Sequence, residues 1–436
     1  MNTGTGADAG KADAGRSAAS NLRVDGARLW DSLEAMARIG PGVAGGNNRQ
    51  TVTDADGEAR RLFQRWCEDA GMTMQVDRMG NMFMRLEGAD PSADPVWMGS
   101  HLDTQPTGGR YDGVLGVLGA LEVVRTIRDR GIKPRRPIVV VNWTNEEGTR
   151  FAPAMLGSGV FAGLHDEAYA NARTDAAGLR FGDELERIGW RGDQPMGGRP
   201  IHALLEYHIE QGPILEAEGR QIGIVTHGQG LWWLHLTLSG RDAHTGSTPM
   251  AMRADAGLGM ARIIEAVNRI ALDHQPGAVG SVGHAVLAPN SPNVIAGTAR
   301  MTIDLRSPDA GKLASMRERV EREAAGIAAA LGLALTVEVT GHFEPVAFDP
   351  ALTALVRDVA GRLGLSHMDI VSGAGHDACW INRIGPTAMI MCPCVGGLSH
   401  NEAEEITPDW AAAGCDVLLN TALELAGVAA GERNSG

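Results

Sequence analysis

The sequence predicts an α/β protein, in which a larger domain built on a mixed sheet carries a second, α+β domain inserted into it. Three observations predict this. Short apolar runs, such as Val96–Met98 and Ile138–Val141, have the composition of buried strands and alternate with longer segments of helical periodicity. The segment from about residue 226 to residue 341 follows a different rhythm of strands and helices. After Pro345, short apolar runs again alternate with segments of helical periodicity.

Periodicity predicts the elements of the larger domain in order. Residues 114–130 carry apolar side chains at helical spacing, and Gly131 follows as a stop signal. By the same criteria, other helices are expected at residues 29–39, 58–71 and 350–363, and further strands at residues 204–209 and 388–391.

The inserted segment is predicted to be a ferredoxin-like module. Its expected order is strand, helix, strand, strand, helix and strand, at residues 231–238, 254–272, 281–287, 299–306, 310–331 and 335–339. The predicted boundaries are a disordered tail at residues 1–20, the first part of the larger domain at 21–225, the insert at 226–341, and the second part at 342–436.

Composition excludes several classes of partner. The chain of 436 residues has a formal charge of −14, which argues against nucleic acid and anionic membranes but not against a small anionic substrate. No run of eighteen apolar residues predicts a transmembrane helix, and the first twenty residues lack the apolar core of a secretory signal. The five cysteines form no disulfide framework, so we expect reduced thiols and a cytoplasmic protein.

Two acidic clusters follow predicted strands and carry most of the functional information. The first contains His101, Asp103 and Asp112, and the second contains Glu146 and Glu147. Nitrogen and oxygen ligands with one spare carboxylate are what a di-metal hydrolase needs. Asp103 is placed to orient the His101 ring, and Asp112 to bridge two cations. The alternatives are a helix N-cap for Asp112 and a solvated acidic turn for the glutamates.

Other candidates have equally ordinary alternatives. His208 and His400 suit metal ligands, although a lone histidine is more often a hydrogen-bonded core residue. Arg306 shares one strand face with Arg300, Thr302 and Asp304, and its guanidinium suits a carboxylate, but it also suits a salt bridge with Asp304. Asn293 is a possible turn residue. His376 is a possible member of a structural His–Asp pair.

Seven motifs occur in order and together resemble one family. They are His101-x-Asp103, Asp112-Gly, Asn145-Glu-Glu-Gly148, His208-Ile-Glu-Gln211-Gly, Ala243-His-Thr-Gly-Ser-Thr-Pro249, Gly373-Ala-Gly-His-Asp-Ala378 and Ser399-His-Asn-Glu402. The chain resembles the di-metal M20 amidohydrolases, in the carbamoylase branch of N-carbamoyl-L-amino acid hydrolases, β-ureidopropionases and allantoate amidohydrolases. Small departures are Tyr207, Thr245 and Ser247. Leu231 stands near a position where the allantoate branch has Gln, which disfavours allantoate.

The resemblance implies a role for each matching residue. The implied metal ligands are His101, Asp112, Glu147, His208 and His400, for two divalent ions of zinc, manganese, cobalt or nickel. Glu146 is the implied general base, with Asp103 supporting the His101 ring. The implied substrate-contacting residues are Gln211, Asn293, Arg306 and His376. Of these, Arg306 and Asn293 would hold the substrate carboxylate. His244 would reach the active site of the other subunit.

The resemblance also implies the fold and the activity. The larger domain would be a metallopeptidase-like catalytic domain and the insert a lid and dimerisation domain. The expected enzyme is a homodimer that cleaves the carbamoyl C–N bond of N-carbamoyl amino acids, of L-α or β-alanine type, to the amino acid, ammonia and carbon dioxide. The alternatives are an allantoate amidohydrolase, an M20 peptidase and a non-catalytic metal-dependent binding protein.

Overall fold

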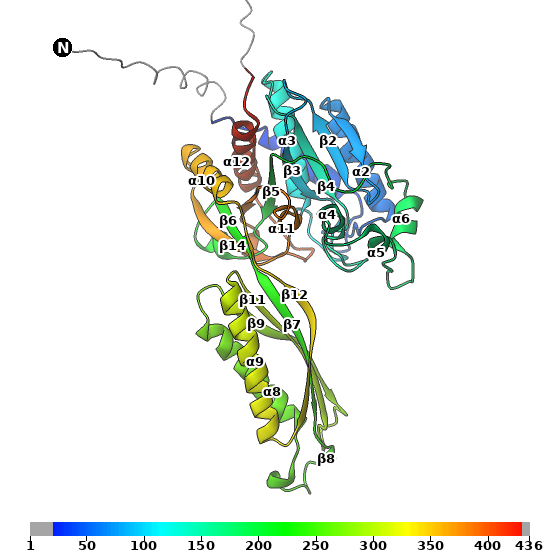
Figure 1. Ribbon diagram of the computed structural model, residues 1–436, viewed down its shortest axis with the longest axis vertical. Helices are drawn as coiled ribbons and strands as arrows, with labels where there is room; N and C mark the ends of the chain where they lie inside the picture. Colours follow the sequence, from blue (N-terminus) through cyan, green and yellow to red (C-terminus); the bar gives the residue numbers. More distant parts are fainter. Residues whose placement is uncertain (1–20, 430–436) are drawn as a thin grey trace, which may run out of the picture. The chain divides into compact units, whose positions relative to one another are not determined.

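The computed structural model describes residues 21–429, so the predicted disordered tail at residues 1–20 lies outside the described residues (Figure 1). The described chain divides into two compact units. The larger unit contains residues 21–226, 348–370 and 375–429, and the smaller contains residues 227–347 and 371–374. Each unit has its own buried apolar cluster. The mixed α/β architecture confirms the predicted fold class.

The larger unit is organised by a mixed sheet. The sheet runs in the order β1-β2-β4-β3-β5-β15-β6-β13, and β14 also pairs with β6. The strands are β1 Thr73–Val76, β2 Met82–Leu86, β3 Val96–His101, β4 Ile138–Trp143, β5 Ala203–Ile209, β6 Ile222–Gly228, β13 Val346–Ala347, β14 His367–Ser372 and β15 Thr387–Cys392. The central strands β4, β3, β5 and β15 run parallel, while β2 and β6 pair antiparallel to their neighbours.

Continuous apolar runs explain why the centre of this sheet is buried. Every residue of β3, β4, β5 and β15 is buried, as expected for strands covered on both faces. The helix α3 Val114–Asp129 packs against β3, β5 and α12 (Figure 1). The other helices of this unit are α1 Gly26–Ala37, α2 Asp54–Asp69, α4 Leu156–Phe161, α5 Glu167–Asn171, α6 Phe181–Arg187, α7 Ile214–Ala217, α10 Pro350–Arg362, α11 Asp377–Ile381 and α12 Pro408–Ala426.

The smaller unit has the predicted strand–helix order. Its elements are β7 Gly230–Ser239, β8 Ala243–His244, α8 Ala256–Asp273, β9 Val279–Ala288, β10 Val294–Ile295, β11 Thr298–Ser307, α9 Ala310–Ala330 and β12 Ala334–Phe343. The four long strands form an antiparallel sheet in the order β12-β7-β11-β9. Alternating residues such as Leu234, Leu236, Met301 and Ile303 face the two helices, which cover one face of the sheet (Figure 1).

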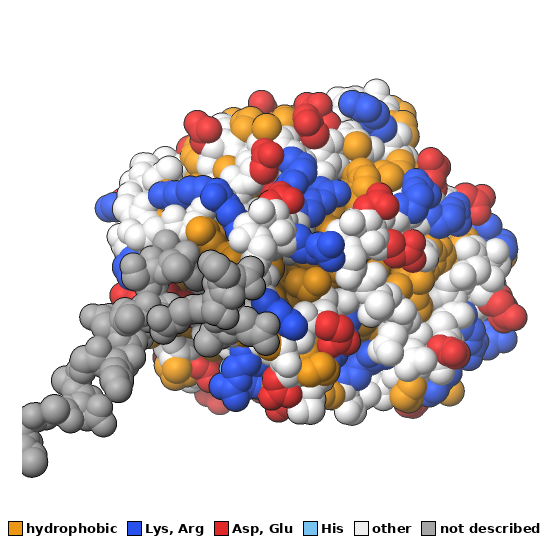
Figure 2. Space-filling model, turned by 90° about the horizontal axis from the view of Figure 1, so that it is seen from above, with side chains coloured by type: hydrophobic (Ala, Val, Ile, Leu, Met, Phe, Trp, Pro, Cys, Tyr) orange, Lys and Arg blue, Asp and Glu red, His pale blue; other side chains and the backbone are white. Residues whose placement is uncertain are grey.

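The surface gives two further observations. On the face shown in Figure 2, Lys and Arg side chains are interspersed with Asp and Glu. Within residues 21–429, no helix combines the length and the apolar character needed to span a bilayer.

Candidate metal centre

Polar side chains gather where the central parallel strands end. His101 is the last residue of β3, His208 lies next to the last residue of β5, and Glu146 and Glu147 follow β4. His400 comes after β15. Because parallel strands bring their carboxyl ends to one edge of a sheet, side chains that are distant in sequence meet there.

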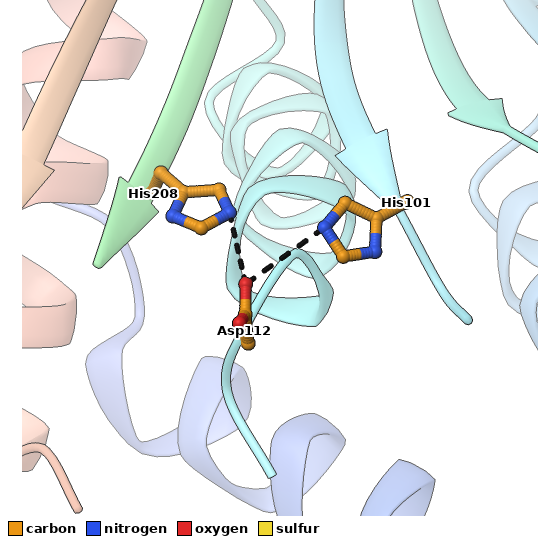
Figure 3. Close-up of side chains that lie close together, drawn as sticks. All are labelled: His101, Asp112 and His208. Atoms are coloured by element: carbon orange, nitrogen blue, oxygen red, sulfur yellow. Dashed lines mark ion pairs between the residues drawn. The ribbon is translucent and has the colours of Figure 1, made fainter. Parts of the chain in front are cut away.

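Asp112, in the loop before α3, lies at the centre of this group. Its Oδ1 is 3.1 Å from Nε2 of His208 and 3.8 Å from Nε2 of His101 (Figure 3). Its Oδ2 is 3.3 Å from Nε2 of His400, which is 3.5 Å from Oε2 of Glu147. The residues thus form two triads that share Asp112, one with His101 and His208 and the other with Glu147 and His400.

Backbone carbonyls orient the two buried imidazole rings. Nδ1 of His101 is 2.9 Å from the carbonyl oxygen of Asp103, and Nδ1 of His208 is 2.9 Å from that of Ile209. Since a carbonyl oxygen only accepts, each Nδ1 carries the proton and donates it. When the rings are neutral, as cation binding requires, Nε2 presents a lone pair. Without a cation, burial lowers the pKa of His208, but the carboxylates of Asp112 and Glu206 overcome this effect and raise the pKa of His208 to about 9. A divalent cation placed between nitrogen and carboxylate satisfies both partners.

The electrostatics of the cluster also suit cations. Burial, together with the nearby carboxylates of Asp377 and Glu147, raises the pKa of Glu146 well above its ordinary value. Burial opposes ionisation of Asp112, yet the imidazoles of His208 and His400, 3.1 and 3.3 Å from its oxygens, hold the pKa of Asp112 well below its usual range. Oε1 of Glu147 is buried and has no hydrogen-bond partner in the described part of the chain. Among residues 21–429, no Lys or Arg pairs with Asp112, Glu146 or Glu147, so cations would supply the missing positive charge.

Two of the ordinary alternatives are wrong for this cluster. Asp112 is not the N-cap of α3, because Gly113 holds that position and no side chain caps the helix. The glutamates are not a solvated acidic turn, because the side chains of Glu146 and Glu147 are only 9% and 5% exposed.

Asp103 supports the site in a different way from the one expected. Its carboxylate was predicted to orient the His101 ring, but that carboxylate lies 4.0 Å from Nδ1, and the backbone carbonyl of Asp103 makes the contact instead. The carboxylate oxygens accept from the backbone N–H groups of Glu146 and Glu147, each at 3.3 Å. Asp103 therefore fixes the loop that carries both glutamates. Oε2 of Glu146 lies 3.5 Å from Nε2 of His101, beside the first triad.

Three of the seven non-glycine residues with positive φ among residues 21–429 lie at the same edge. Asn145, Gln211 and His400 have positive φ angles of 62°, 57° and 52°. Such conformations are costly for residues with a Cβ atom and persist where the surrounding structure holds them in place. The strained positions flank the glutamates, follow His208 by three residues and include His400 itself, which is the distribution expected of a functional site.

A family model identifies the chain as one of a known type. The model of peptidase family M20/M25/M40 matches residues 97–424. This chain belongs to that family. The resemblance stated from the motifs is therefore confirmed.

Relatives within this family are similar over almost the whole chain. An N-carbamoyl-L-amino-acid amidohydrolase from Rhizobium meliloti is 65% identical over 406 residues, which cover 93% of this chain and 98% of that protein. A ureidoglycolate hydrolase from Arabidopsis thaliana is 33% identical and covers 93% and 88% of the two chains. The crystal structure of an amidase of the hydantoinase/carbamoylase family from Burkholderia multivorans matches with a TM-score of 0.91 and 52% identity, over 93% and 98% of the two chains.

Two of the substrate-contacting residues implied for this M20 family chain lie at the centre. Nε2 of Gln211 donates to Oδ2 of Asp112 at 2.8 Å and to the hydroxyl of Ser399 at 3.1 Å. The ring of His376 is buried and lies 4.5 Å, centroid to centroid, from that of His208 in an edge-to-face arrangement. The structure thus brings Gln211 and His376 together with the predicted ligands.

The other implied substrate residues belong to the smaller unit. Nε and Nη2 of Arg306 donate to the carboxylate of Asp304 at 2.8–3.2 Å, so the ion pair considered from the sequence is present. Nη1 donates to the carbonyl of Gly373 at 2.9 Å. Asn293 immediately precedes β10, which pairs with β8 so that Val294 lies opposite His244. Asn293 and His244 therefore lie close together.

The register of the smaller unit's sheet separates two of these residues within a single chain. Arg306 and Asn293 were expected to hold the same carboxylate. Arg306 lies opposite Leu231 at one end of β7, whereas Thr298, at the start of β11, lies opposite Ser239 at the other end. Those eight residues of strand span on the order of 26 Å, and β8 lies at the Ser239 end (Figure 1). One small carboxylate cannot touch both residues of the same chain.

Three residues at the centre were not predicted. Gln105 donates from Nε2 to Oε2 of Glu147 at 2.5 Å. The hydroxyl of Ser399 lies within hydrogen-bond distance of Oδ2 of Asp112, at 3.2 Å. Glu404 is buried beside the same loop. The motif Ser399-His-Asn-Glu402 pointed to this segment, but it stopped at Glu402, whose carboxylate instead accepts from Ala44 and Gly46. The signal for Glu404 in the sequence was that it is the second of the acidic residues that follow His400.

Proposed function

We propose that this protein hydrolyses the carbamoyl C–N bond of N-carbamoyl-L-amino acids, yielding the amino acid, ammonia and carbon dioxide. The observation that carries the proposal is the pair of triads that share Asp112 at the edge of the sheet. The 65% identity to an N-carbamoyl-L-amino-acid amidohydrolase supports the substrate class. Whether β-alanine derivatives are also accepted belongs to the same proposal and is open to assay.

Two divalent cations complete the proposed centre. His101, Asp112 and His208 would hold one, and Asp112, Glu147 and His400 the other. Histidine and carboxylate donors suit zinc, manganese, cobalt or nickel. When bound, such ions lower the pKa of a water and polarise the scissile carbonyl.

Glu146 is the proposed general base. It lies beside the first triad, and the carboxylate of Asp103 holds the backbone of its loop. In the proposed reaction its carboxylate takes the proton from the attacking water and delivers it to the leaving nitrogen. Retention of this glutamate speaks against the alternative of a non-catalytic binding protein.

Substrate recognition is proposed to use both units and two subunits. Arg306 would bind the carboxylate, and Gln211 and His376 the ureido group. Because Asn293 and His244 lie far from Arg306 within the smaller unit, we propose that they serve the site of a second copy in a homodimer, where His244 stabilises the negative charge developing on the carbonyl oxygen. The smaller unit would act as lid and dimerisation domain, in a cytoplasmic enzyme.

An ammonia-release assay tests this function. The panel contains N-carbamoyl-L- and D-amino acids, N-carbamoyl-β-alanine, allantoate, ureidoglycolate and dipeptides, with the protein chelated and then reloaded with each metal. We expect turnover of the N-carbamoyl-L-amino acids that is lost on chelation and restored by metal. Turnover of dipeptides alone would favour the M20 peptidase alternative. Full activity of the chelated protein would exclude the metal centre.

A further inference from the structure

Glu404 joins two loops that are far apart in the sequence. Its Oε1 accepts from the backbone N–H groups of Tyr111 and Asp112, at 3.0 and 3.1 Å. Its Oε2 accepts from the hydroxyl of Ser399 at 3.0 Å. The residue is 2% exposed. A Cβ atom at Gly109 would come within 2.0 Å of its carboxyl carbon, so the loop is packed directly against this carboxylate.

These contacts lie on one side of Asp112. Ser399 lies within hydrogen-bond distance of both Oε2 of Glu404 and Oδ2 of Asp112. Oδ2 is the oxygen that faces His400, whereas Oδ1 faces His208 and His101. Because a hydroxyl has one hydrogen, Ser399 donates to only one of these oxygens at a time, so Glu404 fixes the backbone of Asp112 directly and competes with Oδ2 for the hydroxyl of Ser399. Glu404 also follows His400 by four residues. One short segment therefore carries the candidate ligand His400 and the residue that hydrogen-bonds to a second candidate ligand, Asp112.

We propose that Glu404 is a positioning residue for the second cation site, the one formed by Asp112, Glu147 and His400. This inference rests on the proposed di-metal function. Glu404 sets the distance between Asp112 and His400 and determines which oxygen of Asp112 faces the second ion. Hydrogen-bond partners of metal ligands typically change metal affinity by about 10- to 100-fold when they are lost.

The test measures cation binding instead of activity. Metal-free wild-type protein and Glu404→Gln are titrated calorimetrically with Zn²⁺ and with Mn²⁺, and the bound metal is counted after dialysis. A carboxamide has one oxygen where the carboxylate has two, so the side chain of Glu404→Gln cannot accept both from the backbone N–H groups of Tyr111 and Asp112 and from the hydroxyl of Ser399. We expect wild type to bind two equivalents and the variant to bind the second about 10- to 100-fold more weakly, with the first unchanged.

A neighbouring carboxylate gives the matched control. Glu402 also accepts two backbone N–H groups, those of Ala44 and Gly46, but makes no contact with Asp112. Glu402→Gln should leave both affinities unchanged. Ser399→Ala keeps the backbone contacts of Glu404 and removes the link to Oδ2, so it should weaken the second site less than Glu404→Gln. If Glu404→Gln does not fold, Glu404→Asp, which keeps the charge but shortens the side chain by one methylene, takes its place and should also weaken the second site.

The outcomes separate this inference from the proposed function. Wild-type protein that binds fewer than two cations would overturn the di-metal proposal itself. Two tight cations in wild type and in Glu404→Gln, or equal weakening of both sites, would overturn the positioning role and leave the function standing. If Glu404→Gln fails to fold, unchanged binding of the second cation in Glu404→Asp overturns the positioning role.

Discussion

At the scale of single residues, the candidate centre is organised around the carboxylate of Asp112. One oxygen faces two histidines whose Nδ1 atoms are held by backbone carbonyls, and the other faces His400. A carboxylate that presents its two oxygens to separate donor sets is suited to bridge two cations. Glu146 lies beside the first set and, in the proposed function, remains free to move a proton.

The first prediction concerns Glu146. Glu146→Gln keeps the size of the side chain but removes the proton acceptor, so turnover should fall by about 10²- to 10⁴-fold. Two bound metals per chain should be retained, because the carboxylates and imidazoles of the triads are unchanged. Steady-state kinetics and metal analysis on the same preparation check this. Loss of a metal instead would make Glu146 a ligand.

A second prediction at this scale concerns Arg306. Asp304 and Gly373 orient its guanidinium, and a lysine cannot reproduce that planar set of contacts. Arg306→Lys should lower kcat/KM for an N-carbamoyl-L-amino acid by roughly 10- to 100-fold, the effect of losing a charge-assisted hydrogen bond. Arg300→Lys, on the same face of β11, is the control and should behave as wild type. If the amidated substrate is turned over as well as the acid, Arg306 is not the carboxylate anchor.

At the scale of elements, the junction between β3 and α3 determines where His101 lies. Gly113, the residue before α3, has a φ of 68°, and a Cβ atom there would come within 2.3 Å of the His101 ring. Gly113 is therefore required twice, by the backbone conformation at the start of α3 and by the space that the His101 ring occupies. This contact links local backbone conformation to the geometry of the first triad.

The prediction for this junction is that Gly113→Ala disrupts cation binding. The substitution strains the backbone and displaces the ring, so binding at the triad of His101, Asp112 and His208 should be lost and thermal stability lowered. Gly131→Ala is a matched control, since Gly131 has a φ of 62° but a Cβ atom there would meet nothing within 4 Å. Gly131→Ala should lower the free energy of unfolding only by the backbone strain, about 1 kcal/mol, and should still bind both metals. Calorimetric titration and melting curves measure the two effects, and normal binding by Gly113→Ala would refute the argument.

At the scale of the whole molecule, the smaller unit separates residues that the resemblance assigns to one reaction. Arg306 and His244 lie toward opposite ends of its sheet, whose strand β11 spans on the order of 26 Å between Arg306 and Thr298. If both act on one substrate, they come from different copies of the chain. Assembly would then be part of catalysis.

Subunit mixing tests that inference. His244→Ala and Glu146→Gln subunits are each expected to be inactive, but a mixed dimer would hold one site with both residues intact and one with neither. Mixing the two variants should therefore restore part of the activity. Differently tagged chains establish that subunits exchange. Verified exchange without any recovery would place His244 in the site of its own chain or outside catalysis.

Local patterns predicted much of this molecule. The helices at residues 114–130 and 310–331 and the strand at residues 204–209 were found almost as observed, because apolar periodicity reports which face is buried. The histidines and carboxylates that meet at the sheet edge were also named in advance, since strand ends of a parallel sheet converge. The short strands β1 and β2 and the long helix α12 were not predicted. Their positions depend on pairing and packing with elements elsewhere in the chain.

The sequence by itself determined the fold class, the family and the kinds of side chain available for chemistry, because these follow from composition, spacing and motif. Only the tertiary structure decided how those side chains are used. Glu404 accepts a hydrogen bond from the backbone of Asp112, which lies 292 positions away in the sequence. The carboxylate of Asp103 contacts the loop of Glu146 instead of His101. Arg306 lies far from Asn293 in the smaller unit. Each depends on which backbone donors and strand registers meet in space, and no local pattern of residues encodes such contacts.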